Sequence, residues 1–368
     1  MPAPANTRIT IPRPDDWHLH LRDGDALNAV LPDTARRFAR AIVMPNLKPP
    51  IRTLDDAAGY RERILAALKA NRDAAKLSDD GSNFAPLMTL YLTPETTPDM
   101  VSAAAASEFV HGIKLYPAGA TTNSDAGVNN LDAMSPVFEA MEREGLVLQI
   151  HGEVTDTDVD VFDREHIFIE RHLNPIVERF AGLKIVFEHI TTRDAAEFVA
   201  AAPDTVAATL TPQHLLMNRN AIFVGGIRPH NYCLPVLKRE EHRAALLRAV
   251  TAKDQTKFFI GTDSAPHATH TKETSCGCAG IYSSHGGVEF YAEVFDAADA
   301  LLAASGDVDS RFVNFMSRNG PAFYGLPVNA ETLTIEKVDR PVPESLEFGE
   351  HTLTPLRAGE SLAWRLVD

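Results

Sequence analysis

The stretch "DWHLHL" (residues 16–21) is the first of eight short apolar runs typical of buried strands. The other seven follow along the chain: "RAIVMPN" (40–46), "PLMTLYLT" (86–93), "HGIKLYP" (111–117), "LVLQIHGEV" (146–154), "LKIVFEHI" (183–190), "TVAATLTPQHL" (205–215) and "KFFIGTDSA" (257–265). Helix-like stretches lie between them, for example residues 53–70, 131–145, 164–180 and 238–250. Eight apolar strands that alternate with helices predict a parallel sheet covered on both faces. We therefore expect an α/β fold, a closed (β/α)8 TIM barrel, with an open doubly wound sheet as the alternative.

The pattern changes after Pro327. From there the chain consists of short polar and extended pieces without a helix-like stretch. We therefore expect two parts: residues 1–326 form the barrel, and residues 327–368 form a C-terminal extension packed on it.

The composition narrows the class of partner. The 368 residues carry a formal net charge of −15 and no Lys/Arg run, which argues against a nucleic acid or an anionic membrane as partner. A small-molecule substrate, even an anionic one, is compatible with this charge if it binds in a local cationic pocket. Three cysteines, an odd and low count, argue against a disulfide framework and favour a reducing, cytoplasmic location. The sequence contains no run of 18 apolar residues, so it predicts no membrane span.

Two histidines stand two positions apart in the first run. Residues i and i+2 of a strand point to the same face, so His18 and His20 would point together into the barrel and Leu19 outward. Taken alone, a His-x-His pair is more often two core histidines than a metal site.

Four further polar residues end later strands at a regular interval. His151 follows Lys114 by 37 positions, His189 follows His151 by 38, and Asp263 follows His189 by 74, which is two such intervals. One βα unit has about that length here, so these residues would occupy equivalent places at the carboxyl ends of strands, where barrel active sites lie. Four histidines, an aspartate and a lysine at one mouth are costly to bury unless they bind something. Imidazole and carboxylate together suit Zn²⁺, with Mn²⁺ or Co²⁺ as substitutes.

Lys114 does not fit a metal site as an ammonium, because its charge repels a dication. The residues alone leave three interpretations open. The lysine could bind a substrate carboxylate, form a Schiff base, or react with CO₂ as a buried amine of depressed pKa. The resulting carbamate would be an anionic ligand able to bridge two metal ions.

Ten stretches carry a resemblance to a known family. They are "RPDDWHLHLRDG" (13–24), "RAIVMPNLKPP" (40–50), "KLYPAGATTNS" (114–124), "HGEV" (151–154), "VFEHITT" (186–192), "TPQHL" (211–215), "GGIRPHNYCLP" (225–235), "GTDSAPH" (261–267), "CGCAG" (276–280) and "NGPAFYGLP" (319–327). On these residues the chain resembles the single-function bacterial dihydroorotases of the amidohydrolase superfamily. The resemblance implies a (β/α)8 barrel and the reversible ring closure of N-carbamoyl-L-aspartate to L-dihydroorotate with loss of water, the third step of pyrimidine biosynthesis.

The resemblance also implies a metal centre and a substrate site. It implies two Zn²⁺ ions, one held by His18, His20 and Asp263, the other by His151 and His189, with a carboxylated Lys114 and a hydroxide bridging them. Asp263 would be the catalytic proton carrier. Arg22, Asn46 and His267 would bind the substrate α-carboxylate, Leu234 and Ala279 would contact the ring through their backbones, and Thr121 and Thr122 would close over the substrate on a loop at 117–130. A homodimer is implied as well.

Three other functions stay open at this point. A hydantoinase or dihydropyrimidinase acts on rings without a carboxylate, so Arg22 and Asn46 would have no carboxylate to bind. A nucleobase deaminase uses one metal ion and needs no lysine at the end of the fourth strand. A non-catalytic barrel would be expected to have lost metal ligands, whereas this chain keeps all six.

Overall fold

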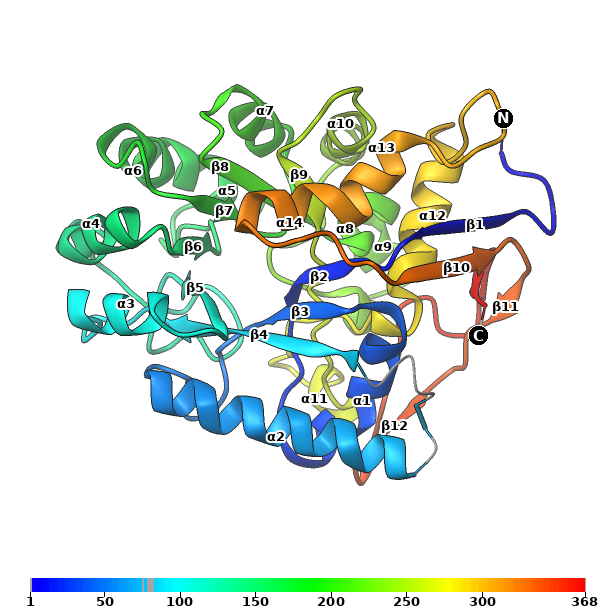
Figure 1. The fold of residues 1–368 in the computed structure, drawn as a ribbon, viewed down its shortest axis with the longest axis horizontal. Coiled ribbons are helices and arrows are strands. Elements are labelled where there is room, and N and C mark those ends of the chain that lie inside the picture. The colour runs from blue at the N-terminus through cyan, green and yellow to red at the C-terminus, as the bar shows by residue number, and fades with distance from the viewer. Residues whose placement is uncertain (1, 75, 78–82, 368) are drawn as a thin grey trace.

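The computed structural model describes residues 2–74, 76–77 and 83–367. Eight parallel strands form one sheet in chain order: β2 (Asp15–Leu19), β3 (Arg40–Val43), β4 (Ala85–Tyr91), β5 (Val110–Leu115), β6 (Val147–Ile150), β7 (Ile185–Phe187), β8 (Val206–Leu210) and β9 (Phe258–Ile260). A parallel bridge between Leu19 and Ser264 joins the first strand to the chain that follows the last, so the sheet closes on itself (Figure 1). The predicted barrel is confirmed, and the alternative prediction of an open doubly wound sheet is wrong.

Helices surround the barrel strands (Figure 1). They are α1 (Gly24–Arg37), α2 (Leu54–Asp73), α3 (Pro98–Ala105), α4 (Ser135–Glu144), α5 (Arg164–Phe168), α6 (Asn174–Arg179), α7 (Arg193–Ala201), α8 (Pro212–Leu216), α9 (Asn220–Phe223), α10 (Glu240–Val250), α11 (Thr269–Lys272), α12 (Gly287–Ala297), α13 (Ser310–Val313) and α14 (Asn319–Tyr324). The four helix-like stretches of the sequence each contain a helix. The start of α2 follows from a capping box, in which the Thr53 side chain accepts from the Asp56 amide and the Asp56 side chain accepts from the Thr53 amide.

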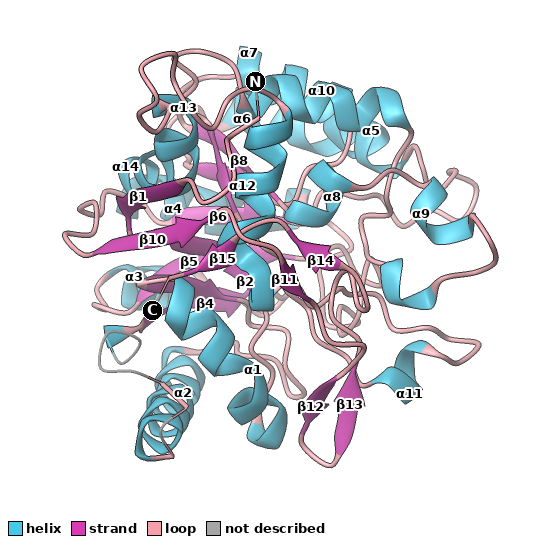
Figure 2. Cartoon of the chain, turned by 90° about the vertical axis from the view of Figure 1, so that its right-hand side faces the viewer, coloured by secondary structure: helices cyan, strands magenta, loops and turns pink. Residues whose placement is uncertain are grey.

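The two ends of the chain share a separate sheet. Strand β1 (Arg8–Pro12) pairs antiparallel with β10 (Thr332–Glu336), which also pairs with β15 (Arg365–Leu366). Two further antiparallel pairs follow: β11 (Arg340–Pro341) with β14 (Ser361–Leu362), and β12 (Leu346–Phe348) with β13 (His351–Leu353) (Figure 2). The division of the chain at 326/327 stays a prediction, and β1 lies in the same sheet as strands beyond it.

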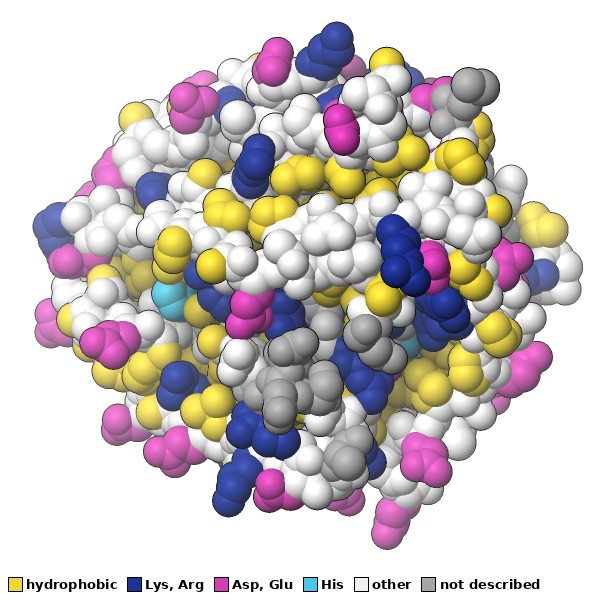
Figure 3. Space-filling model, turned by 45° about the vertical axis from the view of Figure 1, so that its right-hand side comes forward, with side chains coloured by type: hydrophobic (Ala, Val, Ile, Leu, Met, Phe, Trp, Pro, Cys, Tyr) yellow, Lys and Arg dark blue, Asp and Glu magenta, His cyan; other side chains and the backbone are white. Residues whose placement is uncertain are grey.

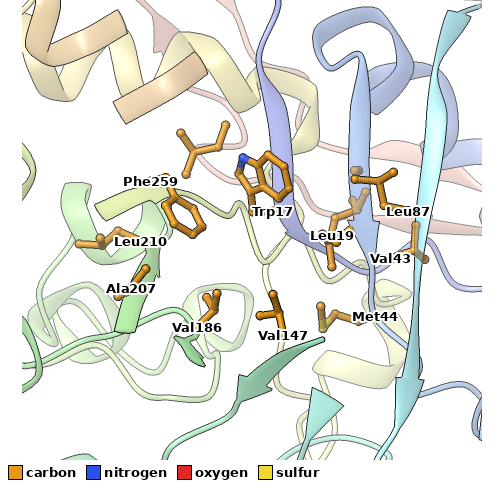
Figure 4. Close-up of a cluster of buried hydrophobic side chains, with 14 of the residues drawn as sticks. Trp17, Leu19, Val43, Met44, Leu87, Val147, Val186, Ala207, Leu210 and Phe259 are labelled. Atoms are coloured by element: carbon orange, nitrogen blue, oxygen red, sulfur yellow. The ribbon is translucent and has the colours of Figure 1, made fainter. Parts of the chain in front are cut away.

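A single large apolar core includes residues of the barrel strands and of the helices around them. Trp17 and Leu19 on β2 are buried among apolar side chains, where Figure 4 shows them with Phe259 of β9. The Trp17 ring stacks on Tyr324 of α14 with 4.5 Å between centroids and meets Phe259 edge-on at 6.0 Å. The register of β2 shifts between Asp16 and Leu19, so simple alternation does not decide where His18 points; its contact with Glu188, the residue after β7, places its ring inside the barrel.

The surface mixes side chains of both charges. On the face in Figure 3, Lys and Arg lie interspersed with Asp and Glu and with apolar side chains. Within the described ranges, no helix is both long and apolar enough to cross a membrane.

Candidate active site

Six side chains singled out in the sequence gather at the carboxyl end of the barrel. They are His18 on β2, His20 just after it, Lys114 near the end of β5, His151 after β6, His189 after β7 and Asp263 after β9. All six are buried. The regular spacing along the sequence therefore corresponds to a common depth in the barrel.

Three of these residues form a cluster that could hold a metal ion. The ligand atoms of His18, His20 and Asp263 lie within 4.8 Å of one another. The Asp263 Oδ1 atom is 3.5 Å from His18 Nε2 and 3.2 Å from His20 Nε2. Backbone bonds that close the barrel fix this geometry, since the Asp263 amide donates to the His18 carbonyl at 2.8 Å and the His20 amide donates to Ser264 at 3.1 Å.

A second polar group holds the other nitrogen of each of these histidines. His18 Nδ1 lies 2.8 Å from Glu188 Oε2, and His20 Nδ1 lies 2.8 Å from Asn46 Oδ1. This contact leaves Nε2 free to bind a metal, which is how outer groups orient imidazole ligands. Burial lowers the pKa of both imidazoles, so both rings are neutral, as ligation requires. Sequence reasoning missed Glu188; its only signal was its place directly before His189.

His151 and His189 form a second pair beside the cluster. Their ring centroids are 4.8 Å apart, and the His189 ring lies 4.9 Å from that of His18. His151 Nε2 contacts Glu153 Oε2 at 2.8 Å, so Nδ1 is the nitrogen of His151 that could bind a metal ion. The buried Nδ1 atom of His189 has no hydrogen-bond partner among the described residues. A neutral buried imidazole without a partner fits a metal ligand.

Lys114 lies below this pair and is fully buried. Its Nζ atom has no hydrogen-bond partner in the described part of the chain and lies 5.0 Å from the centroid of the Tyr116 ring. Burial lowers the pKa of Lys114 to about 8. An isolated buried ammonium is unfavourable, and a partly neutral amine is nucleophilic. These properties fit a lysine whose nitrogen carries a further anionic group.

The site opens into a pocket with about 330 Å³ of atom-free space. Every residue singled out in the sequence lines it, except Lys114, which lies beneath, and His267, which lies behind Arg22. Three residues that sequence reasoning missed, Tyr116, Ala265 and Gly280, also line it.

Arg22 and His267 form a pair at the pocket. Arg22 Nη2 lies 3.0 Å from His267 Nε2, and Arg22 Nε donates to the Pro266 carbonyl at 3.0 Å. Burial and the nearby Arg22 charge lower the pKa of His267 to about 2, so its ring is neutral; its Nε2 atom can either accept from the guanidinium or donate to the Ala279 carbonyl, which lies 3.0 Å away. Arg22, His189 and Asp263 have positive φ angles of 61°, 41° and 42°. Left-handed backbone is uncommon for residues other than glycine and is found preferentially at functional sites.

The loop at 117–130, called the lid below, lies across the mouth. Thr122 Oγ1 donates to the Ala279 carbonyl at 3.3 Å, and Asn46 Nδ2 donates to the Thr122 carbonyl at 3.1 Å. The amide of Asn46, expected to reach the substrate carboxylate, thus bonds to His20 and to the lid in this structure. Leu234, Thr121 and Ala279 line the pocket, and their expected contacts with a substrate stay predictions.

Comparisons with known proteins agree with this geometry. The model of the family described as "Amidohydrolase family" matches residues 11–337. A protein named dihydroorotase from Methylobacillus flagellatus is 60% identical over 362 residues, which are 98% of this chain and 99% of that protein. The structure of a dihydroorotase from Campylobacter jejuni has 32% sequence identity and a TM-score of 0.85, covering 100% of this chain and 99% of that one. The dihydroorotase of Saccharomyces cerevisiae, solved in complex with 5-fluoroorotic acid, has 32% identity and a TM-score of 0.83, with 98% of each chain covered.

Proposed function

This chain belongs to the amidohydrolase family, and we infer that it is a dihydroorotase, the enzyme of pyrimidine biosynthesis that closes N-carbamoyl-L-aspartate reversibly to L-dihydroorotate with loss of water. One observation of the geometry carries the inference. The half-buried Arg22 guanidinium lies at the same barrel mouth as His18, His20 and Asp263. A hydrolytic centre beside a cation suits a cyclic amide that also bears a carboxylate, and this carboxylate separates dihydroorotate from dihydrouracil and hydantoin.

Two Zn²⁺ ions would complete the centre. One ion would be held by His18, His20 and Asp263, the other by His151 and His189, and a carboxylated Lys114 and a hydroxide would lie between them. The support is that Lys114 Nζ and His189 Nδ1 are buried without a hydrogen-bond partner among the described residues. When bound, the ions would lower the pKa of a water molecule and polarise the substrate carbonyl.

Asp263 would carry the proton. Burial alone would raise the pKa of Asp263, but the nearby His20 and His18 rings lower it below its ordinary value. The carboxylate is therefore ionised at neutral pH and ready to accept a proton. In the hydrolytic direction Asp263 takes the proton of the attacking water and delivers it to the ring nitrogen that leaves. In the biosynthetic direction the same transfers run in reverse.

The remaining side chains would bind and orient the substrate. Arg22 would take the α-carboxylate, helped by His267 and Asn46, since a planar guanidinium binds a carboxylate through two parallel bonds. The backbones of Leu234 and Ala279 would contact the ring, and Thr121 and Thr122 would bond to the substrate and exclude water as the lid closes.

A parallel substrate panel tests this function. Purified protein with zinc is offered L-dihydroorotate, dihydrouracil, hydantoin and cytosine, and ring opening is followed by loss of absorbance. We expect turnover of dihydroorotate well above that of the others. An Asp263→Asn variant serves as the matched control and should be inactive on all four. Preferred hydrolysis of hydantoin or dihydrouracil, release of ammonia from cytosine, or no turnover at all would each overturn the proposal.

Homodimerisation and a cytoplasmic location complete the proposal. The three cysteines are unpaired, as in proteins of reducing compartments. Sedimentation of the purified protein at several concentrations tests the dimer; a monomer at all of them would contradict it.

A further inference from the structure

Lys272, the last residue of α11, is buried beside the active-site mouth. Helix α11 lies next to the β12–β13 hairpin (Figure 2). The Lys272 ammonium donates to three backbone carbonyls, those of Tyr232 at 3.0 Å, Cys278 at 2.9 Å and Gly280 at 2.5 Å. An ammonium has three N–H donors, so all of them are used. Because the Gly280 amide also donates to Tyr232 at 3.0 Å, two chain segments far apart in sequence are tied at this point.

Both tied segments carry residues of the pocket. Leu234 lies two positions after the first acceptor, and Ala279 lies between the other two. Successive carbonyls of an extended chain point to opposite sides. Since Lys272 binds the carbonyls on either side of Ala279, the Ala279 carbonyl faces the opposite way. There it accepts from Thr122 of the lid at 3.3 Å and lies 3.0 Å from His267 Nε2.

The backbone at Gly280 lies close to Ala265 and His267. Gly280 has a φ of +149°, and a Cβ there would lie 2.6 Å from the Ala265 carbonyl and 2.8 Å from His267 Cδ2. A small displacement of this backbone would therefore move both the lid's acceptor and the ring that pairs with Arg22.

The stability of the fold does not explain why a charged side chain is buried at position 272. Burial lowers the pKa of Lys272 to about 8, which means that the surroundings disfavour its ammonium form. Buried charges often give way to apolar side chains without loss of stability. The charge is better explained by the orientation that it imposes on the three carbonyls.

We propose that Lys272 is a positioning residue of the active site, which sets the Ala279 carbonyl as the docking point for Thr122 of the lid. This inference rests on the proposed function. Lys272 does not line the pocket, and it acts through the backbone carbonyls of Tyr232, Cys278 and Gly280.

A double-mutant cycle tests the inference. Lys272→Met removes the three donors, and Thr122→Val removes the lid hydroxyl while keeping its shape. We expect Lys272→Met to lower kcat/KM for dihydroorotate by about 10- to 100-fold, with lower kcat and raised KM, as for other small displacements of active-site groups. Adding Thr122→Val to Lys272→Met should cost little more, because both changes break the same docking contact. Zinc content should stay at the parent value.

Hydrogen exchange of the lid provides a readout that a purely structural role would not move. Dihydroorotate should slow exchange across 117–130 in the parent and not in Lys272→Met. Lys257→Met is the matched control, since the Lys257 ammonium also donates to two backbone carbonyls, but at Val199 and Ala202. It should keep parental kinetics and lid protection.

A second variant covers the case in which Lys272→Met does not fold. Lys272→Gln keeps a polar group with two N–H donors but reaches one atom less far, and the same lack of additivity with Thr122→Val is expected. The inference would be overturned if the losses in kcat/KM from the changes at residues 272 and 122 multiplied in the double variant. It would also be overturned if dihydroorotate still slowed hydrogen exchange of the lid in Lys272→Met. A parent inactive on dihydroorotate would instead refute the proposed function, so the two failures are distinguishable.

Discussion

Glu188 contacts the Nδ1 atom of His18: Glu188 Oε2 lies 2.8 Å from it, and both side chains are fully buried. Thr209 donates to the same oxygen. The ring is thus fixed with Nε2 turned to Asp263, the geometry in which it can bind a metal ion. The acid next to His189 in the sequence therefore serves a histidine on another strand.

Replacing Glu188 should weaken metal binding. Glu188→Gln keeps the shape but replaces a carboxylate oxygen by an amide group, which orients and polarises the imidazole less well, so zinc affinity should fall about 10- to 100-fold. Competition with a chromogenic chelator measures this affinity. Glu336→Gln, a change of a glutamate that pairs with Arg8 and Arg365 in the terminal sheet, is the control and should bind zinc as the parent does. Equal affinities in both variants would refute the role of Glu188.

Lys114→Ala should lose metal and activity together, because the proposed bridging ligand disappears. Metal analysis of protein purified without chelator should find about two ions per parent chain, the pattern of two-metal hydrolytic sites. The control is Lys184→Ala, whose ammonium donates to the Phe323 carbonyl away from the mouth. Mass spectrometry under mild conditions should detect the added CO₂ on the parent. A free Lys114 amine in an active, metal-loaded crystal would rule the carbamate out.

Arg22→Met should impair recognition of the substrate carboxylate while leaving the metal content intact. The loss in kcat/KM for dihydroorotate should be roughly 2–4 kcal/mol, the range for removing one partner of a buried charge-assisted pair. Dihydrouracil, which lacks the carboxylate, should lose much less. Arg63→Met, at an exposed arginine paired with Asp23, is the control. If the preference between the two substrates stays parental, Arg22 does not read the carboxylate.

Thr121→Ala combined with Thr122→Ala should depress kcat strongly while metals and fold stay intact, because the lid would no longer bond to substrate or dock on Ala279. Steady-state kinetics and hydrogen exchange across 117–130 measure the effect. Asn130→Ala, in the same loop but bonded to the Ala133 amide, should behave as the parent does. Near-parental kinetics in the double variant, with exchange that substrate does not slow, would make the lid an ordinary surface loop.

His285 should make the protein sensitive to acid. Burial lowers its pKa to about 3, below the ordinary 6.5 of the unfolded chain, so the unfolded state binds a proton first as pH falls. Stability from this group is complete above about pH 6.5 and is lost progressively toward pH 3; the loss between pH 7.5 and 5 is about 2 kcal/mol. Denaturant unfolding at both pH values should show this loss shrink in His285→Phe relative to the parent. An unchanged pH dependence would exclude His285 as its source.

Local patterns revealed the strands but not where they end. The run "KFFIGTDSA" predicts a strand to residue 265, whereas β9 ends at Ile260 and Asp263 has a positive φ. In "TVAATLTPQHL", β8 ends at Leu210, and Thr211 caps α8 by accepting from the His214 amide. Polar residues enter both runs only near or after the strand ends, and composition alone did not place the boundaries.

The terminal sheet was beyond prediction. Strand β1 pairs with β10, and Arg8 lies opposite Glu336. An antiparallel partner more than 300 positions away leaves no mark on the five residues of β1, because strand pairing is decided by packing and by which edge remains open.

The sequence by itself determined the barrel and which residues reach its mouth. Both follow from periodicity: eight apolar runs alternate with helices, and a constant βα length brings His151, His189 and Asp263 to one level. The tertiary structure alone decided which groups hold these side chains in place. Glu188, the tie at Lys272 and the lid on Ala279 depend on contacts between segments far apart in the chain. Such contacts are selected by distance and burial in three dimensions, and no local pattern encodes them.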